Sequence, residues 1–288
     1  MPEEIPLFFD CAGDQLLGIL HRARDGDRGV GVLLVVGGPQ YRVGSHRQFV
    51  LLARQLAEAG IPVFRFDCRG MGDSEGAPRD FEGIAQDIGS ALDAFCEQMP
   101  AISRFVLWGL CDAATANAFY ARTDDRVVGQ IALNPWVRTD EGEAQAFIKH
   151  YYLQRLLSGA FWRKVLSLQF DAAGAMRDFL VKLGQSRGGS RGRYDTRDTR
   201  PLPVRLRESQ IAFPGATLLI LSGRDLTAKE YELRVAESVE WQAWMASAAV
   251  SVQRLEEADH TFSCAAWRDR VAAWSRDWIL GLAGSKRG

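Results

Sequence analysis

Short apolar runs rich in β-branched residues recur along the chain, and stretches with the spacing of amphipathic helices separate them. The runs that predict strands are 30–36, 61–66, 104–108, 127–133 and 217–221. The stretches that predict helices between them are 46–59, 81–97 and 112–121. Because the runs are apolar throughout rather than alternating, both faces of the sheet should be covered. The pattern predicts an α/β fold with a mostly parallel sheet and helices on both faces.

The two ends of the chain extend this pattern. Residues 6–20 indicate two short strands around a turn, an antiparallel hairpin at one edge of the sheet. Near the other end we expect a long helix over 228–248, a strand over 250–255 and a last helix over 265–281.

The alternation stops between 138 and 210, where a helical, aromatic and arginine-rich stretch replaces it. Its tail at 184–203 is rich in Gly, Ser, Arg and Asp, which predicts a mobile loop. We therefore expect a core domain of residues 1–137 and 211–288, with a helical cap or lid inserted at 138–210.

Composition narrows the possible partners. With 35 Lys and Arg against 36 Asp and Glu, the net charge of −1 provides no field that would attract nucleic acid or an anionic membrane. No apolar run reaches the roughly 18 residues of a membrane span, so no membrane insertion is expected. The N-terminus is acidic and lacks the apolar region of a signal peptide, which favours a cytoplasmic protein.

The five cysteines form no CxxC pair and have no histidine at zinc-binding spacing. Neither a disulfide framework nor a metal site is expected, and no cofactor motif is present. In a reducing compartment most such cysteines are small buried hydrophobes. A role for any one of them requires local support.

That support exists for Gly109-Leu110-Cys111-Asp112-Ala113, which follows a predicted strand and precedes a predicted helix. A nucleophile on so sharp a turn requires small residues two positions before and after it. Gly109 and Ala113 meet this requirement, although alanine is larger than the glycine usual there. The helix N-terminus favours the thiolate form of Cys111. Cys111 is the candidate nucleophile, and a buried, inert cysteine is the alternative.

A nucleophilic cysteine needs a base and a group that orients the base. His260 lies between the strand 250–255 and the last helix, at the sheet edge where catalytic groups of α/β proteins gather. Asp225 follows the strand 217–221 and leads into a helix. The three residues then occur in the order nucleophile, acid, base. The alternatives are a helix N-cap for Asp225 and a residue of the loop before the last helix for His260.

Two backbone N–H groups are expected to stabilise an oxyanion. One belongs to Asp112, directly after the nucleophile, and the other comes from the segment GGPQ at 37–40. Proline has no N–H, so Pro39 is excluded and Gln40 is the expected second donor.

The sequence DCRGMGDS at 67–74 has the form D-x-R-G-x-G-x-S. With the turn at Cys111 and the order of the candidate residues, it resembles the α/β-hydrolase superfamily outside the insertion, where this motif is structural. GGPQYRVGSHRQF (37–49), GLCD (109–112) and ADHTF (258–262) are similar to the exosortase A system-associated hydrolase 1 family. The resemblance implies an α/β-hydrolase fold with a cap and a cytoplasmic hydrolase linked to bacterial exopolysaccharide and exosortase A systems.

Four polar residues near the segment 37–40 are candidate substrate ligands, namely Arg42, Ser45, His46 and Arg47. The guanidinium of Arg42 or Arg47 could bind a substrate carboxylate or phosphate. The alternative for the last three is a helix N-cap followed by the first helical turn.

These features together predict an esterase or thioesterase that forms an acyl-cysteine intermediate on a small-molecule acyl ester or thioester. Two alternatives stay open: an acyltransferase that uses a sugar hydroxyl in place of water, and a non-catalytic scaffold or binding module that retains the fold. The presence of nucleophile, acid and base in the expected order argues against the scaffold. The sequence leaves the oligomeric state open.

Overall fold

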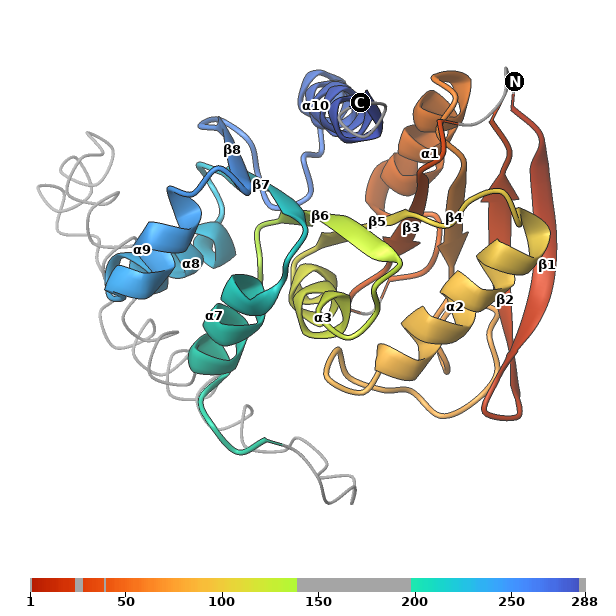
Figure 1. Ribbon diagram of the computed structural model, residues 1–288, viewed down its shortest axis with the longest axis horizontal. Coiled ribbons are helices and arrows are strands. Elements are labelled where there is room, and N and C mark those ends of the chain that lie inside the picture. The colour runs from red at the N-terminus through yellow and green to blue at the C-terminus, as the bar shows by residue number, and fades with distance from the viewer. Residues whose placement is uncertain (1, 24–27, 39, 139–197, 285–288) are drawn as a thin grey trace, which may run out of the picture. The chain divides into compact units, whose positions relative to one another are not determined.

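The computed structural model describes residues 2–23, 28–38, 40–138 and 198–284. They form an eight-stranded sheet in the order β1-β2-β4-β3-β5-β6-β7-β8 (Figure 1). The strands are β1 Glu4–Cys11, β2 Asp14–His21, β3 Gly31–Val35, β4 Val63–Phe66, β5 Phe105–Leu110, β6 Val127–Leu133, β7 Ala216–Ser222 and β8 Val250–Leu255. β2 pairs antiparallel with β1 and β4, and the other pairs are parallel. The mostly parallel sheet and the N-terminal hairpin are thus confirmed.

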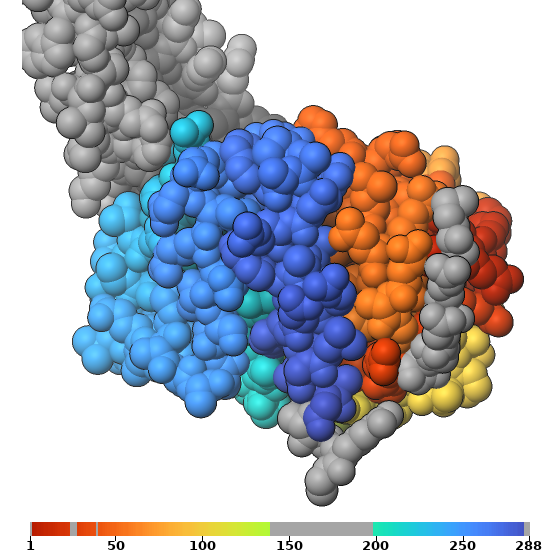
Figure 2. Space-filling model, turned by 90° about the horizontal axis from the view of Figure 1, so that it is seen from above, coloured from red at the N-terminus to blue at the C-terminus, as the bar shows by residue number. Residues whose placement is uncertain are grey.

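Helices cover both faces of this sheet. They are α1 Gln48–Glu58, α2 Ala85–Gln98, α3 Asp112–Ala121, α7 Leu202–Ala212, α8 Leu226–Ala236, α9 Val239–Met245 and α10 Ala265–Gly284, with a short 3-10 turn η1 at Ser45–Arg47. Helices α1 and α10 lie side by side over one face, and α2, α3 and α7 lie on the other (Figures 1 and 2). None of these described helices combines the length and the hydropathy that crossing a bilayer requires.

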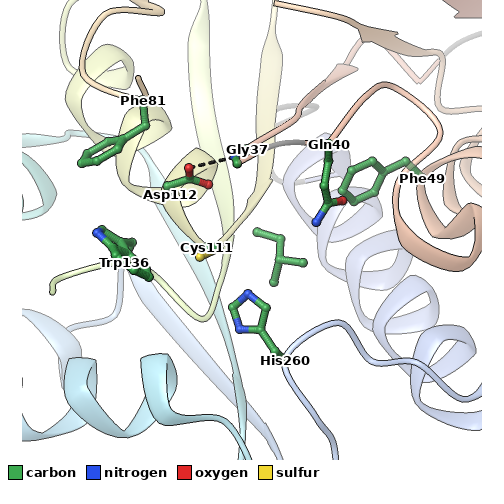
Figure 3. Close-up of a pocket in the computed structure, with 10 residues that line it drawn as sticks. Gly37, Gln40, Phe49, Phe81, Cys111, Asp112, Trp136 and His260 are labelled. Atoms are coloured by element: carbon green, nitrogen blue, oxygen red, sulfur yellow. Dashed lines mark hydrogen bonds between the residues drawn. The ribbon is translucent and has the colours of Figure 1, made fainter. Parts of the chain in front are cut away.

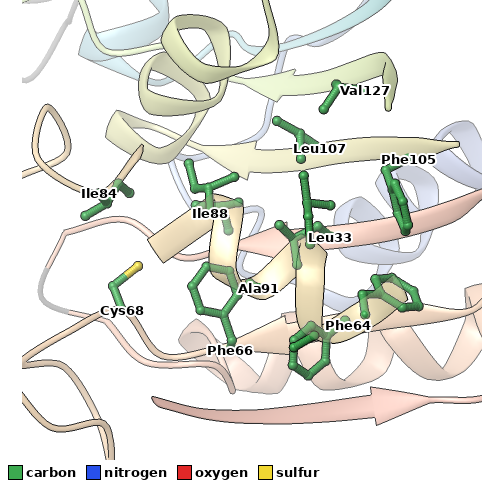
Figure 4. Packing of buried hydrophobic residues seen from close by; sticks show 14 of the residues in the cluster. Leu33, Phe64, Phe66, Cys68, Ile84, Ile88, Ala91, Phe105, Leu107 and Val127 are labelled. Atoms are coloured by element: carbon green, nitrogen blue, oxygen red, sulfur yellow. The ribbon is translucent and has the colours of Figure 1, made fainter. Parts of the chain in front are cut away.

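The core lies on both sides of the central strands, which are buried along their whole length in β3, β4 and β5. On the α2 side, Phe64, Phe66 and Phe105 pack with aliphatic side chains from the helix and the neighbouring strands (Figure 4). On the α1 side, Phe49 meets Trp108 edge to face at 5.5 Å between ring centroids. This burial on two faces explains why the strands are apolar throughout.

The single long helix expected over 228–248 is wrong, because the chain forms two helices there, α8 and α9. Ser238 lies between them with an extended backbone, and its hydroxyl accepts the N–H of Trp241 at 3.3 Å. A serine that caps a new helix in this way competes with continuation of the preceding one.

The C-terminal boundary expected for the insertion also needs correction. Helix α7 falls inside the expected 138–210 but packs on α3, and the core unit resumes at Leu202. Its buried residues include the polar Gln210, which accepts hydrogen bonds from the Tyr231 hydroxyl at 3.1 Å and the Trp241 indole at 2.7 Å. A helix that buries polar groups has no apolar stripe to reveal it. Residues 139–197, and with them most of the expected cap and its tail, lie outside the described residues.

The D-x-R-G-x-G-x-S segment at 67–74 forms a hydrogen-bonded loop after β4. The buried Asp67 carboxylate accepts the backbone N–H groups of Arg42 at 2.6 Å and Asp73 at 3.1 Å. The Ser74 hydroxyl donates to the Asp67 carbonyl oxygen at 2.8 Å and accepts the N–H of Leu17 at 2.9 Å. The segment thereby ties the loop after β4 to the N-terminal hairpin.

The same segment yields a stability prediction. Arg69 and Asp87 are both buried and pair at 2.8 Å, so Asp87→Ala leaves a buried guanidinium without its partner. We expect a loss of about 3 to 5 kcal/mol in the free energy of unfolding, measured by urea denaturation. The matched control is Asp93→Ala on the same helix, because Asp93 pairs with Arg126 at 2.7 Å but is largely exposed. That change should cost less than about 1 kcal/mol, and equal losses in the two variants would contradict the prediction.

Candidate active site

Cys111 occupies the turn between β5 and α3 and is the N-cap residue of that helix. Its backbone has φ 63° and ψ −124°, a conformation that side chains other than glycine rarely adopt. Hydrogen bonds hold it there: its N–H donates to the Leu133 carbonyl oxygen at 2.8 Å, and its carbonyl oxygen accepts the N–H of Trp136 at 3.2 Å. This is the strained strand-to-helix turn expected for a nucleophile.

Positions 109 and 113, on either side of Cys111, hold small residues for different physical reasons. A Cβ on Gly109 would lie 2.8 Å from the Ala113 carbonyl carbon and 2.6 Å from Nδ2 of the Asn117 side chain, so position 109 requires glycine. Ala113 itself is fully buried in the apolar cluster on the α2 face. Alanine is therefore accommodated here, because its methyl group faces the core.

Asp225 performs two structural tasks at once. As the N-cap of α8, its carboxylate accepts the N–H groups of Thr227 at 3.1 Å and Ala228 at 3.2 Å. The same carboxylate lies 2.8 Å from Nδ1 of His260. The helix-cap alternative and the contact with His260 are therefore compatible, and the cap fixes the carboxylate that faces the imidazole.

His260 lies between Asp225 and Cys111, and its protonation depends on both. Burial by itself lowers the pKa of His260, but hydrogen bonds and charge interactions with Asp225 and Cys111 outweigh it and raise the pKa to about 10. The structure thus brings together three residues from the carboxyl ends of β5, β7 and β8, with the imidazole of His260 between the other two.

The loop that carries His260 is held by two residues that the sequence analysis did not single out. The buried Asn134 amide donates to the Ser222 hydroxyl at 2.9 Å and to the His260 carbonyl oxygen at 3.2 Å. The Ser222 hydroxyl donates to the Asp259 carbonyl oxygen at 2.9 Å. Their only signal in the sequence is position, since both are polar residues at the carboxyl ends of strands.

A cavity of about 350 Å³ opens above Cys111 (Figure 3). Among the described residues its lining consists of Gly37, Gly38, Gln40, Phe49, Phe81, Leu110, Cys111, Asp112, Trp136 and His260. Figure 3 shows Cys111 and His260 facing one space, with Phe81 and Trp136 on one side and Phe49 on the other. No local pattern in the sequence indicates these apolar walls, because their side chains come from separate loops and helices.

The two expected oxyanion donors have different surroundings. Asp112 is the first residue of α3, so its N–H has no acceptor within the helix. In the segment 37–40, the N–H of Gly38 donates to Oδ2 of Asp112 at 2.8 Å, and the Gln40 side chain lines the cavity. Gln40 as second donor stays a prediction, and Gly38 joins it as a candidate.

The four candidate substrate ligands near this segment lie apart from the cavity lining that the structure describes. The Arg42 guanidinium is bound to the carboxylates of Asp67 and Asp73, and binding of a substrate anion by Arg42 or Arg47 stays a prediction. Ser45 makes no side-chain cap, and His46 and Arg47 have left-handed backbones, so helix α1 begins only at Gln48. The expected N-cap and first turn at 45–47 is therefore wrong.

Residues 32–274 match the alpha/beta hydrolase family, and the chain belongs to this family. The match spans the strands and helices that carry Cys111, Asp225 and His260. No curated protein matches the chain.

Solved structures agree with the family. An esterase from Pyrococcus furiosus superposes with a TM-score of 0.66 at 14% identity, covering 96% of this chain and 91% of that one. Est1E from Butyrivibrio proteoclasticus, solved with ferulic acid bound, has a TM-score of 0.61 at 16% identity and coverages of 96% and 98%. A putative hydrolase from Agrobacterium vitis has a TM-score of 0.60 at 16% identity and coverages of 97% and 99%. At these identities the similarity establishes the α/β-hydrolase fold.

Proposed function

We propose that this protein hydrolyses an ester or thioester of a small molecule through an acyl intermediate on Cys111. The observation that carries the proposal is one imidazole that lies 2.8 Å from the Asp225 carboxylate and lines the same cavity as Cys111, whose interaction helps to raise the pKa of His260. That arrangement is what a nucleophile, a base and an orienting acid require.

Because the pKa of His260 is raised to about 10, the proton of Cys111 resides on His260 before the reaction begins. In the first half of the reaction, the thiolate sulfur attacks the carbonyl carbon of the substrate. The carbonyl π electrons move to the oxygen, and backbone N–H groups stabilise the resulting oxyanion. When the carbonyl reforms, the bond to the leaving alcohol or thiol breaks. His260 gives its proton to that leaving group, which leaves an acyl thioester on Cys111.

In the second half, His260 removes a proton from water, whose oxygen attacks the acyl carbon. Collapse of the second tetrahedral intermediate expels the Cys111 sulfur as a thiolate, and the proton stays on His260. Throughout, Asp225 holds the tautomer that places Nε2 towards the sulfur and stabilises the imidazolium when it forms.

The cavity and the sequence motifs suggest the kind of substrate. Phe49, Phe81 and Trp136 present apolar surface on either side of Cys111, which suits an acyl group with apolar carbon atoms. The resemblance of the segments at 37–49 and 258–262 to the exosortase A system-associated hydrolase 1 family supports a role in bacterial exopolysaccharide metabolism.

Trapping the intermediate tests the proposal. On mixing with p-nitrophenyl butyrate, we expect a burst of p-nitrophenol and a protein mass increased by one butyryl group, mapped to Cys111 after acid quenching and proteolysis. The control is Cys264→Ser, because Cys264 is exposed and should be dispensable. Failure to form an acyl group on Cys111 with any of a panel of esters and thioesters would instead favour a non-catalytic role.

A further inference from the structure

The carboxylate of Asp112, the residue after Cys111, is bound to backbone N–H groups of the loop after β3 and of helix α3. Its Oδ2 accepts the N–H of Gly38 at 2.8 Å, and its Oδ1 accepts the N–H of Ala113 at 2.9 Å. Burial raises the pKa of the Asp112 carboxyl, and the N–H groups of Gly38, Ala113 and Asp112 itself act in the opposite direction. The carboxylate therefore interacts with N–H groups from both segments that border Cys111.

These are the two segments from which an oxyanion would draw its donors. A developing oxyanion needs N–H groups about 2.7 to 3.1 Å away, one from the residue after the nucleophile and one from the loop after β3. A short N–H bond to a carboxylate is a strong, charge-assisted one. Because two negatively charged oxygens repel each other at close range, the Asp112 carboxylate and an oxyanion cannot share the N–H of Gly38.

The surroundings show how closely the carboxylate is held. A Cβ on Gly37 would collide with the Asp112 carboxylate and would lie 2.7 Å from the backbone nitrogen of Ala113. Asp112 also lines the same cavity as Cys111 and His260, and Figure 3 shows its hydrogen bond to the loop that carries Gly37. The carboxylate is thus beside the site of reaction.

We propose that in the resting enzyme the Asp112 carboxylate occupies the N–H of Gly38, a candidate oxyanion donor, and that the substrate carbonyl oxygen must displace it before acylation. This inference rests on the proposed function, since it requires Cys111 to form tetrahedral adducts. The inference gives Asp112 two opposing roles. Its backbone N–H stabilises the oxyanion, whereas its side chain competes with the oxyanion.

The test compares two ligands of equal chain length. Butanal adds to the Cys111 thiol to form a hemithioacetal whose oxygen needs the donors, whereas butan-1-ol fills the cavity without an oxyanion. In Asp112→Ala the affinity for butanal should rise on the order of tenfold, while the affinity for butan-1-ol stays the same. Asp112→Asn should give a smaller gain, because its neutral oxygen is a weaker acceptor for the N–H of Gly38.

Turnover provides a second readout. The kcat/KM for p-nitrophenyl butyrate should rise in Asp112→Ala and, less strongly, in Asp112→Asn. If the Asp112 side chain only stabilises the loop at Gly37, both variants should bind the aldehyde and the alcohol more weakly and turn over p-nitrophenyl butyrate more slowly. That result would overturn the inference. Equal aldehyde affinity in all three proteins would also overturn it.

The outcomes separate the two proposals. If wild-type Cys111 forms no hemithioacetal, as judged by a Cys111→Ala variant with the same affinity for butanal, the proposed function fails and this inference fails with it. If wild-type Cys111 forms the adduct but neither Asp112 variant binds butanal more tightly, the proposed function stands and only the inference about Asp112 is refuted.

Discussion

Replacing Cys111 with alanine is expected to lower kcat/KM for p-nitrophenyl butyrate on the order of 10⁴-fold or more, to the level of the uncatalysed reaction. The sulfur is the atom that accepts the acyl group, and among the described residues that line the cavity no other side chain offers a thiol or hydroxyl group. Steady-state kinetics with a buffer blank measure this loss.

The fold should survive this substitution. Cys111 has a φ of 63°, and alanine carries the same backbone strain there as cysteine. Circular dichroism and urea denaturation should therefore match the wild type within about 1 kcal/mol. Substantial activity remaining in a folded Cys111→Ala protein would show that Cys111 is not the nucleophile.

The second large effect is expected for Asp225→Asn, with a loss of about 10⁴-fold in kcat. The amide can present its NH₂ group to Nδ1 of His260 and so favour the wrong tautomer. Asparagine caps helices as well as aspartate does, so the hydrogen bonds to Thr227 and Ala228 can persist. Asp225→Ala is the informative comparison, because it should lose both activity and about 1 kcal/mol of stability.

The pH profile distinguishes a role in orientation from a role in folding. His260 has a raised pKa, so the imidazolium that protonates the leaving group persists below about pH 10 and is lost as the pH rises through that value. Since the hydrogen bond to Asp225 contributes to this shift, the alkaline limb of kcat/KM should move to lower pH in Asp225→Asn. An unchanged limb with near-normal kcat would mean that another carboxylate orients His260.

Much of the fold follows from local pattern. A strand with both faces covered is largely apolar, so β6 could be predicted at the bounds that the structure gives it. The edge strand β8 is only partly buried, and its alternation of Val and polar residues predicted the same bounds that the structure gives it. The turn at Cys111 was also predictable, because a sharp strand-to-helix turn demands a glycine at position 109. Helix caps were harder to place, since Ser238 looks like any polar residue of a long helix until its partner Trp241 is known.

The polar partnerships depended on tertiary structure. Arg42 pairs with Asp67 and Asp73, which lie in the loop after a different strand, and nothing in the local sequence indicates these ion pairs. Gln210 belongs to the core because Tyr231 and Trp241 supply its hydrogen bonds. A buried polar group is tolerated only where partners exist, and partners distant in sequence leave no periodic signal.

The sequence by itself determined the strands, the turn at Cys111 and the candidates Asp225 and His260, because each depends on nearest neighbours and on which edge of the sheet a strand ends. Only the tertiary structure decided that Asp225 faces His260 at 2.8 Å, that Asn134 holds the loop of His260, and that the Asp112 carboxylate binds the N–H of Gly38. These contacts join strands and loops far apart along the chain. Their geometry is set by the packing of the whole sheet rather than by any local preference.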